Sequence, residues 1–283
     1  MDPIDAFTRR FTSEDLAPLP AGWRVGPPDF VGVGCGKAGS TWWYHLLCQH
    51  PAVVPNRLGL KELVFFSHGG WRRPTDADLE LYRSVFARPP GHLCGDWTAN
   101  YLYAPFALDA LALAAPDAKL ILTVRNPVDR FVSMLNQFTL HRAELVGATG
   151  RGRTVLETWS LFPEAAHQSR IADGVERMLR LFPREQIHVV QYERAKASPH
   201  AEFARTLRFL GHDDRWVPQD AARPVHKNRY VVERPSGGDR EWIADWFRDD
   251  VERTAALLPE VDPALWGDFA SPVAVGPALA ARG

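Results

Sequence analysis

A glycine-rich segment, GCGKAGSTWW at residues 34–43, combines groups that bind a phosphate or a sulfate. Glycines let backbone amides approach an anion closely, and Lys37 adds a positive charge. Hydroxyl groups follow at Ser40 and Thr41, where a helix is expected to begin with partial positive charge at its N-terminus. A plain glycine-rich turn with a solvated lysine is the alternative. The expected anion site is formed by Gly36, Lys37, Ala38, Gly39, Ser40 and Thr41.

This segment differs from the Walker A loop of nucleotide triphosphatases, whose pattern is GxxxxGK[ST]. Ala38 follows the lysine, Val31 stands at the position of the first glycine, and the hydroxyl residues come three and four positions after Lys37. The later apolar run KLILTV ends in Arg125, so no Walker B carboxylate follows it to hold magnesium. Phosphate binding without a metal is therefore predicted. A metal-dependent nucleotide kinase and a catalytically inactive nucleotide-binding module remain as alternatives.

A second motif, RNPVDRFVS at residues 125–133, contains another pair of candidate phosphate ligands. Arg125 ends an apolar run, and Ser133 lies two helical turns further along. An arginine binds a phosphate with two parallel hydrogen bonds, and a serine adds a further donor. Because an arginine at the start of a helix commonly faces solvent, this motif is weak when taken alone.

The pattern of apolar runs predicts an α/β fold. Strands are expected at residues 30–35, 92–98, 119–124 and 186–192. Helices are expected at 41–49, 76–87, 105–115, 165–182, 199–210 and 240–257, with another after Arg125 and a loop or lid at 147–163. Strands that alternate with helices predict a P-loop-like central parallel sheet flanked by helices, with ligands at the carboxyl ends of the strands. The expected organisation is an N-terminal arm (1–29), a single domain (30–270) and a tail (271–283).

Composition narrows the partners and the compartment. The formal net charge of −1 gives no global basic field, so neither nucleic acid nor an anionic membrane is expected as a partner. The cysteines, Cys35, Cys48 and Cys94, are odd in number and form no CxxC pair, which argues against disulfides and zinc. The sequence shows no signal-peptide pattern and no membrane-spanning apolar stretch, so a cytoplasmic protein is expected.

Together the motifs resemble those of the sulfotransferases that depend on 3′-phosphoadenosine 5′-phosphosulfate (PAPS), in the style of the heparan sulfate branch. KAGSTW is similar to that family's 5′-phosphosulfate loop, KxGxTW, and LTVRNPVDRFVS is similar to its 3′-phosphate signature. KELVFF resembles a segment that carries a catalytic glutamate, and QYERA resembles a strand end of the family. The resemblance covers about residues 30–230. It implies sulfonate transfer from PAPS, without a metal, to a hydroxyl group of a small molecule or carbohydrate.

The resemblance also implies which residues bind the cofactor. Lys37 would contact the bridging region of the phosphosulfate, and Trp42 would stack on adenine. Ser40 and Thr41 would hold the 5′-phosphate. The remaining cofactor residues, at the 3′-phosphate, in a late basic loop and at the QYERA strand end, would be Arg125, Ser133, Lys227, Arg229 and Tyr192.

For catalysis, the resemblance implies that Glu62 removes the proton of the acceptor. The apolar run that follows Glu62 predicts its partial burial, whereas a plain surface glutamate is the alternative. The match is incomplete, because Val64 and Trp97 replace a histidine and a lysine of the heparan sulfate branch, and His68 is an alternative base. The residues that form either an aromatic acceptor pocket or ordinary core are Trp71, Trp97, Trp159 and Phe162.

Overall fold

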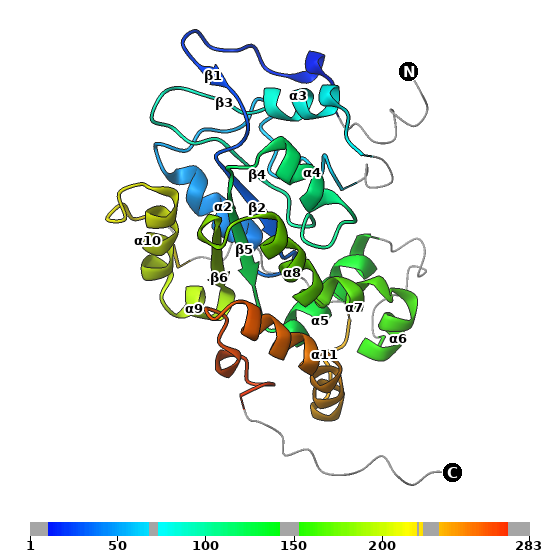
Figure 1. Ribbon diagram of the computed structural model, residues 1–283. Coiled ribbons are helices and arrows are strands. Elements are labelled where there is room, and N and C mark those ends of the chain that lie inside the picture. The colour runs from blue at the N-terminus through cyan, green and yellow to red at the C-terminus, as the bar shows by residue number, and fades with distance from the viewer. Residues whose placement is uncertain (1–10, 68–72, 142–152, 220, 223–231, 271–283) are drawn as a thin grey trace.

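The computed structural model of the protein describes residues 11–67, 73–141, 153–219, 221–222 and 232–270. A four-stranded parallel sheet with the strand order β4-β2-β5-β6 lies at its centre (Figure 1). The strands are β2 (Phe30–Gly34), β4 (Gly95–Trp97), β5 (Lys119–Val124) and β6 (Ile187–Gln191). Each lies within a run that the sequence predicted as a strand, so the predicted parallel sheet is confirmed.

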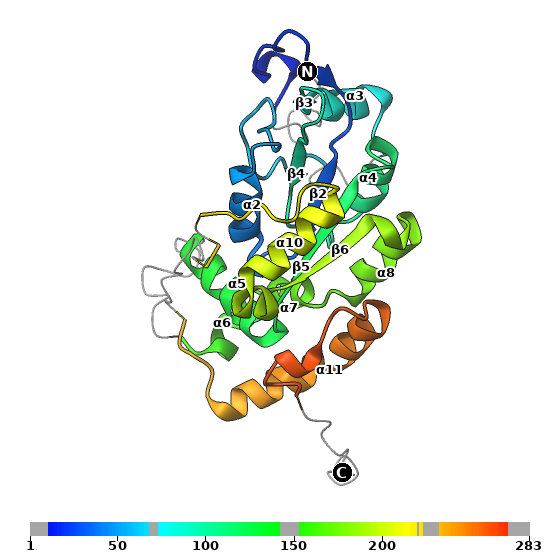
Figure 2. The same ribbon diagram turned by 90° about the vertical axis from the view of Figure 1, so that its left-hand side faces the viewer.

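Helices cover both faces of this sheet (Figures 1 and 2). Ile121 of β5 packs with residues of one face, whereas Leu120 and Leu122 belong to the core on the other face. Alternate side chains of one strand thus enter two hydrophobic cores, as in other doubly covered parallel sheets. Within the described residues, no helix is both long and apolar enough to cross a bilayer. The first face is covered by α2 (Ser40–Gln49) and α10 (Pro199–Leu210), and the second by α4 (Ala107–Ala114), α5 (Pro127–His141), α8 (Ala172–Leu181) and α11 (Gly237–Leu257).

Residues before β2 pack with residues of the segment between β2 and β4. The short strand β1 (Arg24–Val25) pairs antiparallel with β3 (Ala87–Arg88). The buried ring of Phe11 lies 5.3 Å from the ring of Phe65. The boundary between arm and domain at residue 29 stays a prediction. The short helical elements of this region are η1 (Ser13–Asp15) and α3 (Asp76–Ser84).

The single helix predicted at residues 165–182 is wrong, because the chain forms α7 (Glu164–Ser169) and then α8. The carboxylate of Asp250 in α11 accepts hydrogen bonds from the backbone amides of Ile171 at 2.9 Å and Ala172 at 3.0 Å. These amides lie at the N-terminus of α8, where a helix has no acceptors of its own. A distant carboxylate therefore starts a new helix where local sequence favours a continuous one.

Short helices also replace other predicted elements. Part of the expected loop at 147–163 forms α6 (Val155–Leu161), which begins with a capping box between Thr154 and Glu157; residues 147–152 lie outside the described residues. The expected strand at 186–192 ends earlier, since α9 begins at its last residue. The remaining short elements are η2 (Arg184–Gln186), α9 (Tyr192–Ala197) and η3 (Pro263–Leu265).

His188 of β6 predicts a loss of stability in acid. Its Nε2 lies 3.0 Å from the hydroxyl oxygen of Thr206, and burial, with nearby Arg205 and Arg184, lowers its pKa from 6.5 to about 3. In the unfolded chain His188 binds a proton at a higher pH than it does in the folded chain. The contribution of neutral His188 to the free energy of unfolding is therefore fully present above pH 6.5. It is lost as the pH falls from 6.5 toward the folded-state pKa of about 3.

We expect His188→Gln to remove this pH dependence, because glutamine bonds to Thr206 but does not titrate. Between neutral pH and about pH 4, the free energy of unfolding of the wild type should fall by roughly 3 kcal/mol more than that of the variant. Urea titrations at several pH values measure both slopes, and equal slopes would contradict the assignment.

Candidate functional site

The glycine-rich loop joins β2 to α2 and is bonded to the elements behind it. The carbonyl oxygen of Gly36 accepts a hydrogen bond from Arg130 Nε at 2.9 Å, and that of Lys37 accepts one from Arg125 Nη1 at 3.2 Å. Lys37 (φ 65°) and Gly39 (φ 85°) both have left-handed backbone conformations. Left-handed residues in a tight turn direct successive amides to one side and form a nest that binds anions.

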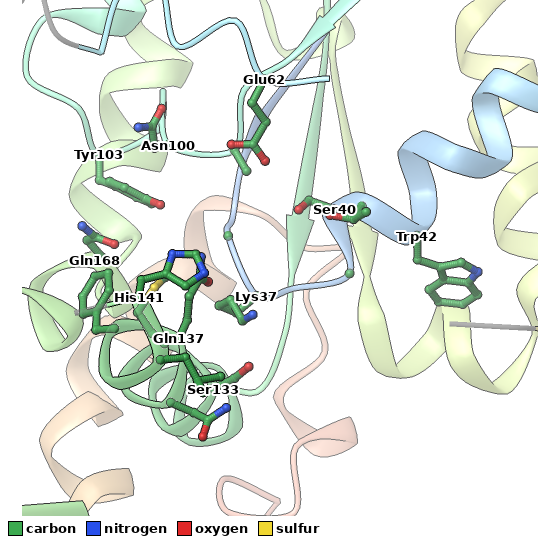
Figure 3. Close-up of a pocket in the computed structure, with 18 of the residues that line it drawn as sticks. Lys37, Ser40, Trp42, Glu62, Asn100, Tyr103, Ser133, Gln137, His141 and Gln168 are labelled. Carbon is green, nitrogen blue, oxygen red and sulfur yellow. The ribbon is translucent and has the colours of Figure 1, made fainter. Parts of the chain in front are cut away.

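A cavity of about 570 Å³ opens beside this loop, at the carboxyl ends of the strands. Its walls come from segments that follow all of the central strands. Most of the loop residues from Gly36 to Trp42 follow β2, Asn100 and Tyr103 follow β4, Ser133 lies in α5 after β5, and Tyr192 follows β6. In Figure 3, Glu62 points into the cavity from the side opposite Ser133, and Lys37 lies between them. The topology of the sheet thus brings both sequence motifs and Glu62 to one place.

Most of the residues predicted to bind the cofactor line this cavity. Ala38 is the exception within the loop, since its side chain is buried in the core beneath it. Within the described residues, no group of three or more His, Cys, Asp or Glu side chains is placed to hold a metal ion. The predicted residues in the cavity walls are Gly36, Lys37, Gly39, Ser40, Thr41, Trp42, Glu62, Ser133 and Tyr192.

Arg125 lies behind Lys37 and beside Tyr192 rather than in the cavity wall. Its guanidinium carbon is 4.8 Å from the centroid of the Tyr192 ring, and its Nη2 is 3.7 Å from the carboxylate of Asp129. Burial, and then the charge of Arg125, lower the pKa of Lys37. Two cations therefore stand close together at the loop, and each favours an anion beside it.

Trp42 and Tyr192 form an aromatic wall next to the loop. Their ring centroids are 6.1 Å apart in an edge-to-face arrangement, and the Trp42 side chain is largely buried. The indole Nε1 of Trp42 donates a hydrogen bond to the carbonyl oxygen of Ala221 at 3.1 Å. The Tyr192 ring also contacts Gly39, which ties this wall to the anion loop.

Glu62 is exposed to the cavity, because 44% of its side chain is accessible. It forms an ion pair with the adjacent Lys61. The partial burial predicted for Glu62 is therefore wrong, because the burial falls on the apolar residues that follow it, of which Leu63 and Val64 are buried. A carboxylate that is held on a buried segment and open to the cavity is accessible to a substrate.

Polar side chains that sequence analysis missed complete the walls. Gln137 and His141 follow Ser133 at intervals of four residues along α5, so all of them share one helix face. That spacing is readable in the sequence and is the signal that would have found them. Three others come from segments that the sequence alone does not bring together: Asn100, Tyr103 and Gln168 (Figure 3).

Three of the four aromatic residues considered for an acceptor pocket belong to the core and do not line the cavity. Trp97 is 0% exposed and lies against Gly32, where an added Cβ would be 2.3 Å from its ring. Trp159 packs on Phe131 with ring centroids 5.1 Å apart, and Phe162 is buried in the same core. The core interpretation of these three residues is therefore correct. The predicted residues outside the described part of the chain are His68, Trp71, Lys227 and Arg229.

Known proteins resemble this chain in sequence and in structure. Residues 103–231 match the sulfotransferase domain. Human bifunctional heparan sulfate N-deacetylase/N-sulfotransferase 3 is 25% identical over 266 residues, which cover 82% of this chain and 30% of that protein. Human heparan sulfate glucosamine 3-O-sulfotransferase 3B1 is 29% identical over 191 residues, which cover 65% of this chain and 46% of that protein. The crystal structure of a sulfotransferase from Alicyclobacillus acidocaldarius, 24% identical, matches with a TM-score of 0.67 over 85% of this chain and 99% of that chain.

The fold is that of an α/β protein of the P-loop-like class, with a cavity at the carboxyl ends of its strands. The match to the sulfotransferase domain confirms the resemblance that the motifs predicted, and the chain shares the fold of the solved bacterial sulfotransferase. It spans less than half the length of the two human relatives, at 30% and 46%.

Substitution of Gly39 tests the contact between the glycine-rich loop and the aromatic wall. An alanine Cβ there would lie 2.8 Å from Cδ2 of Tyr192, whereas Gly22, with a similar φ of 77°, has open space. Both Gly→Ala substitutions strain the backbone, but only Gly39→Ala displaces a ring. We expect Gly39→Ala to lower the free energy of unfolding by at least about 1 kcal/mol more than Gly22→Ala does. Urea unfolding measures both, and equal losses would show that the contact imposes no constraint.

Proposed function

We propose that this protein transfers a sulfonate group from PAPS to a hydroxyl group of a small molecule or carbohydrate. The observation that carries the proposal is a single cavity that contains the glycine-rich loop, Ser133 and Glu62. These provide an anion site, a second phosphate donor and a carboxylate base. The match of residues 103–231 to the sulfotransferase domain supports PAPS as the donor.

The described residues fit the charged groups of PAPS, which supplies the sulfonate group. The first amides of α2 have no acceptors within the helix, and with Ser40 and Thr41 they suit the 5′-phosphate. Lys37 is suited to the bridging oxygen, where negative charge develops as the bond to sulfur breaks. The 3′-phosphate is assigned to Arg125 and Ser133, the adenine side to Trp42 and Tyr192, and the late basic loop to Lys227 and Arg229 as predictions from sequence.

Glu62 is assigned as the base for the acceptor. As the acceptor oxygen bonds to sulfur and the bridging oxygen leaves, Glu62 takes the hydroxyl proton. The cavity that contains Glu62 is also lined by neutral amides and a phenol. Such groups both donate hydrogen bonds to hydroxyl groups and accept them. We therefore assign the acceptor's hydroxyl groups to Asn100, Tyr103, Gln137 and Gln168.

A cytoplasmic location is part of the same proposal. The three cysteines Cys35, Cys48 and Cys94 are free thiols in the structure. Free thiols persist in a reducing compartment, which is the observation that supports this location.

Binding of adenosine 3′,5′-bisphosphate tests the donor site. We expect Arg125→Ala to weaken binding by about 1.5–3 kcal/mol and Ser133→Ala by about 0.5–1.5 kcal/mol, because a charged donor bonds more strongly than a neutral hydroxyl. Isothermal titration calorimetry in EDTA measures both losses and also tests binding without a metal. Arg177→Ala, which removes an arginine paired with Asp109 at 2.6 Å, is the control and should bind normally. Unchanged affinity in Arg125→Ala would refute the 3′-phosphate assignment, and binding that EDTA abolishes would refute the metal-free site.

A single-turnover experiment tests the base, with an acceptor found by screening hydroxyl compounds for sulfonation from PAPS. Glu62→Gln should slow the chemical step by ~100-fold or more and leave nucleotide affinity nearly unchanged, since glutamine cannot accept a proton at neutral pH. His68→Ala tests the alternative base predicted from sequence, and His141→Gln tests the histidine in the cavity wall. If a histidine variant is inactive and Glu62→Gln is not, the base is wrongly assigned.

A further inference from the structure

A fully buried carboxylate, Asp96 of β4, lies beneath the segment that carries Glu62. Its side chain is 0% exposed. One oxygen accepts a hydrogen bond from the hydroxyl of Tyr82 at 3.1 Å, and the other accepts one from the hydroxyl of Thr98 at 2.7 Å. Burying a carboxylate is costly unless its partners hold it well, so its position needs an explanation beyond filling space.

The hydrogen bonds of Asp96 continue into the Glu62 segment. Because the Thr98 hydroxyl donates its proton to Asp96, its lone pairs are available, and it accepts from the backbone amide of Val64 at 3.2 Å. On the other side of Glu62, the amide of Trp97 donates to the carbonyl oxygen of Lys61 at 3.2 Å. Bonds from Trp97 of β4 and from Thr98, the residue after this strand, therefore hold the backbone both before and after Glu62.

The backbone at this point needs such support. Val64 has a φ of 54°, in the left-handed region that a β-branched residue rarely adopts. Strain of this kind persists only where the surroundings fix it, and it gathers at functional sites. Two residues after Val64, Phe66 packs on Tyr82 with ring centroids 4.6 Å apart. Tyr82, whose hydroxyl bonds to Asp96, therefore also holds the far end of the segment.

We propose that Asp96 is a positioning residue, which acts through Thr98 and Tyr82 to hold the Lys61–Phe66 backbone so that Glu62 points into the cavity. The proposal rests on the proposed function, in which Glu62 is the base. Burial raises the pKa of Asp96 to about 6, so the carboxylate is mainly ionised at pH 8 and both hydroxyl groups must donate to it.

The test is a double-mutant cycle of single-turnover rates at pH 8. Asp96→Asn keeps the shape but replaces one acceptor with an amide, and Thr98→Val removes the connecting hydroxyl. Each should slow the chemical step by ~10- to 100-fold through misplacement of Glu62, with affinity for adenosine 3′,5′-bisphosphate within about twofold of wild type. In the Glu62→Gln background, the same substitutions should change the rate by less than about twofold, because they act through Glu62.

A matched control separates positioning from general loss of stability. Asp250 is another buried carboxylate, and it bonds to backbone amides at the start of α8. Asp250→Asn should lower the free energy of unfolding while the rate of the folded enzyme stays at the wild-type value. Tyr82→Phe, which deletes the other hydroxyl, provides an independent variant if Asp96→Asn fails to fold.

The outcomes distinguish this inference from the proposed function. If Glu62→Gln retains full activity, the assignment of the base fails, and the role of Asp96 toward it fails as well. If Glu62→Gln is slow but Thr98→Val and Asp96→Asn keep the wild-type rate, only the positioning role is refuted. An equal rate penalty in both backgrounds would also refute it, since Asp96 would then act independently of Glu62.

Discussion

The position of the glycine-rich loop depends on its attachment to the neighbouring strand. Where β2 ends, the amide of Cys35 donates to the carbonyl oxygen of Thr123 at 2.7 Å, and the Thr123 hydroxyl donates to the carbonyl oxygen of Gly34 at 2.9 Å. The same strand, β5, continues into Arg125, which bonds to the backbone of Lys37. The register between β2 and β5 therefore brings the two motifs together, and a shift of this pairing would separate them.

Positive charge at the site is local, since the whole chain has a net charge of −1. Besides its positive charge, the buried Arg130 provides a structural link. It donates hydrogen bonds both to the carbonyl oxygen of Gly36 and to that of Gln168. One side chain thus joins the anion loop to the opposite wall of the cavity. A fixed arrangement of charges and donors is what the proposed sulfonate transfer requires, because positioning and electrostatics supply most of the rate enhancement in such chemistry.

The features that sequence predicts here are local, and those that it misses depend on distant contacts. The strand, loop and helix around Lys37 follow from glycines, a lysine and an apolar run within about fifteen residues, and their family resemblance was specific. By contrast, the break before α8 requires Asp250, which lies 79 positions beyond Ile171. The orientation of Glu62 likewise depends on Thr98, 34 positions from Val64. Neither contact leaves a periodic pattern in the chain.

The aromatic wall of the cavity is completed late during synthesis of the chain. The hydrogen bond from Trp42 to Ala221 joins residues 179 positions apart. At ribosomal rates of about 5–20 residues per second, the partner of Trp42 is made roughly 10 to 35 seconds after the tryptophan itself. The anion loop and most of the sheet leave the ribosome during that interval. A nascent chain therefore contains the groups that are predicted to bind phosphate well before it has a closed wall beside them.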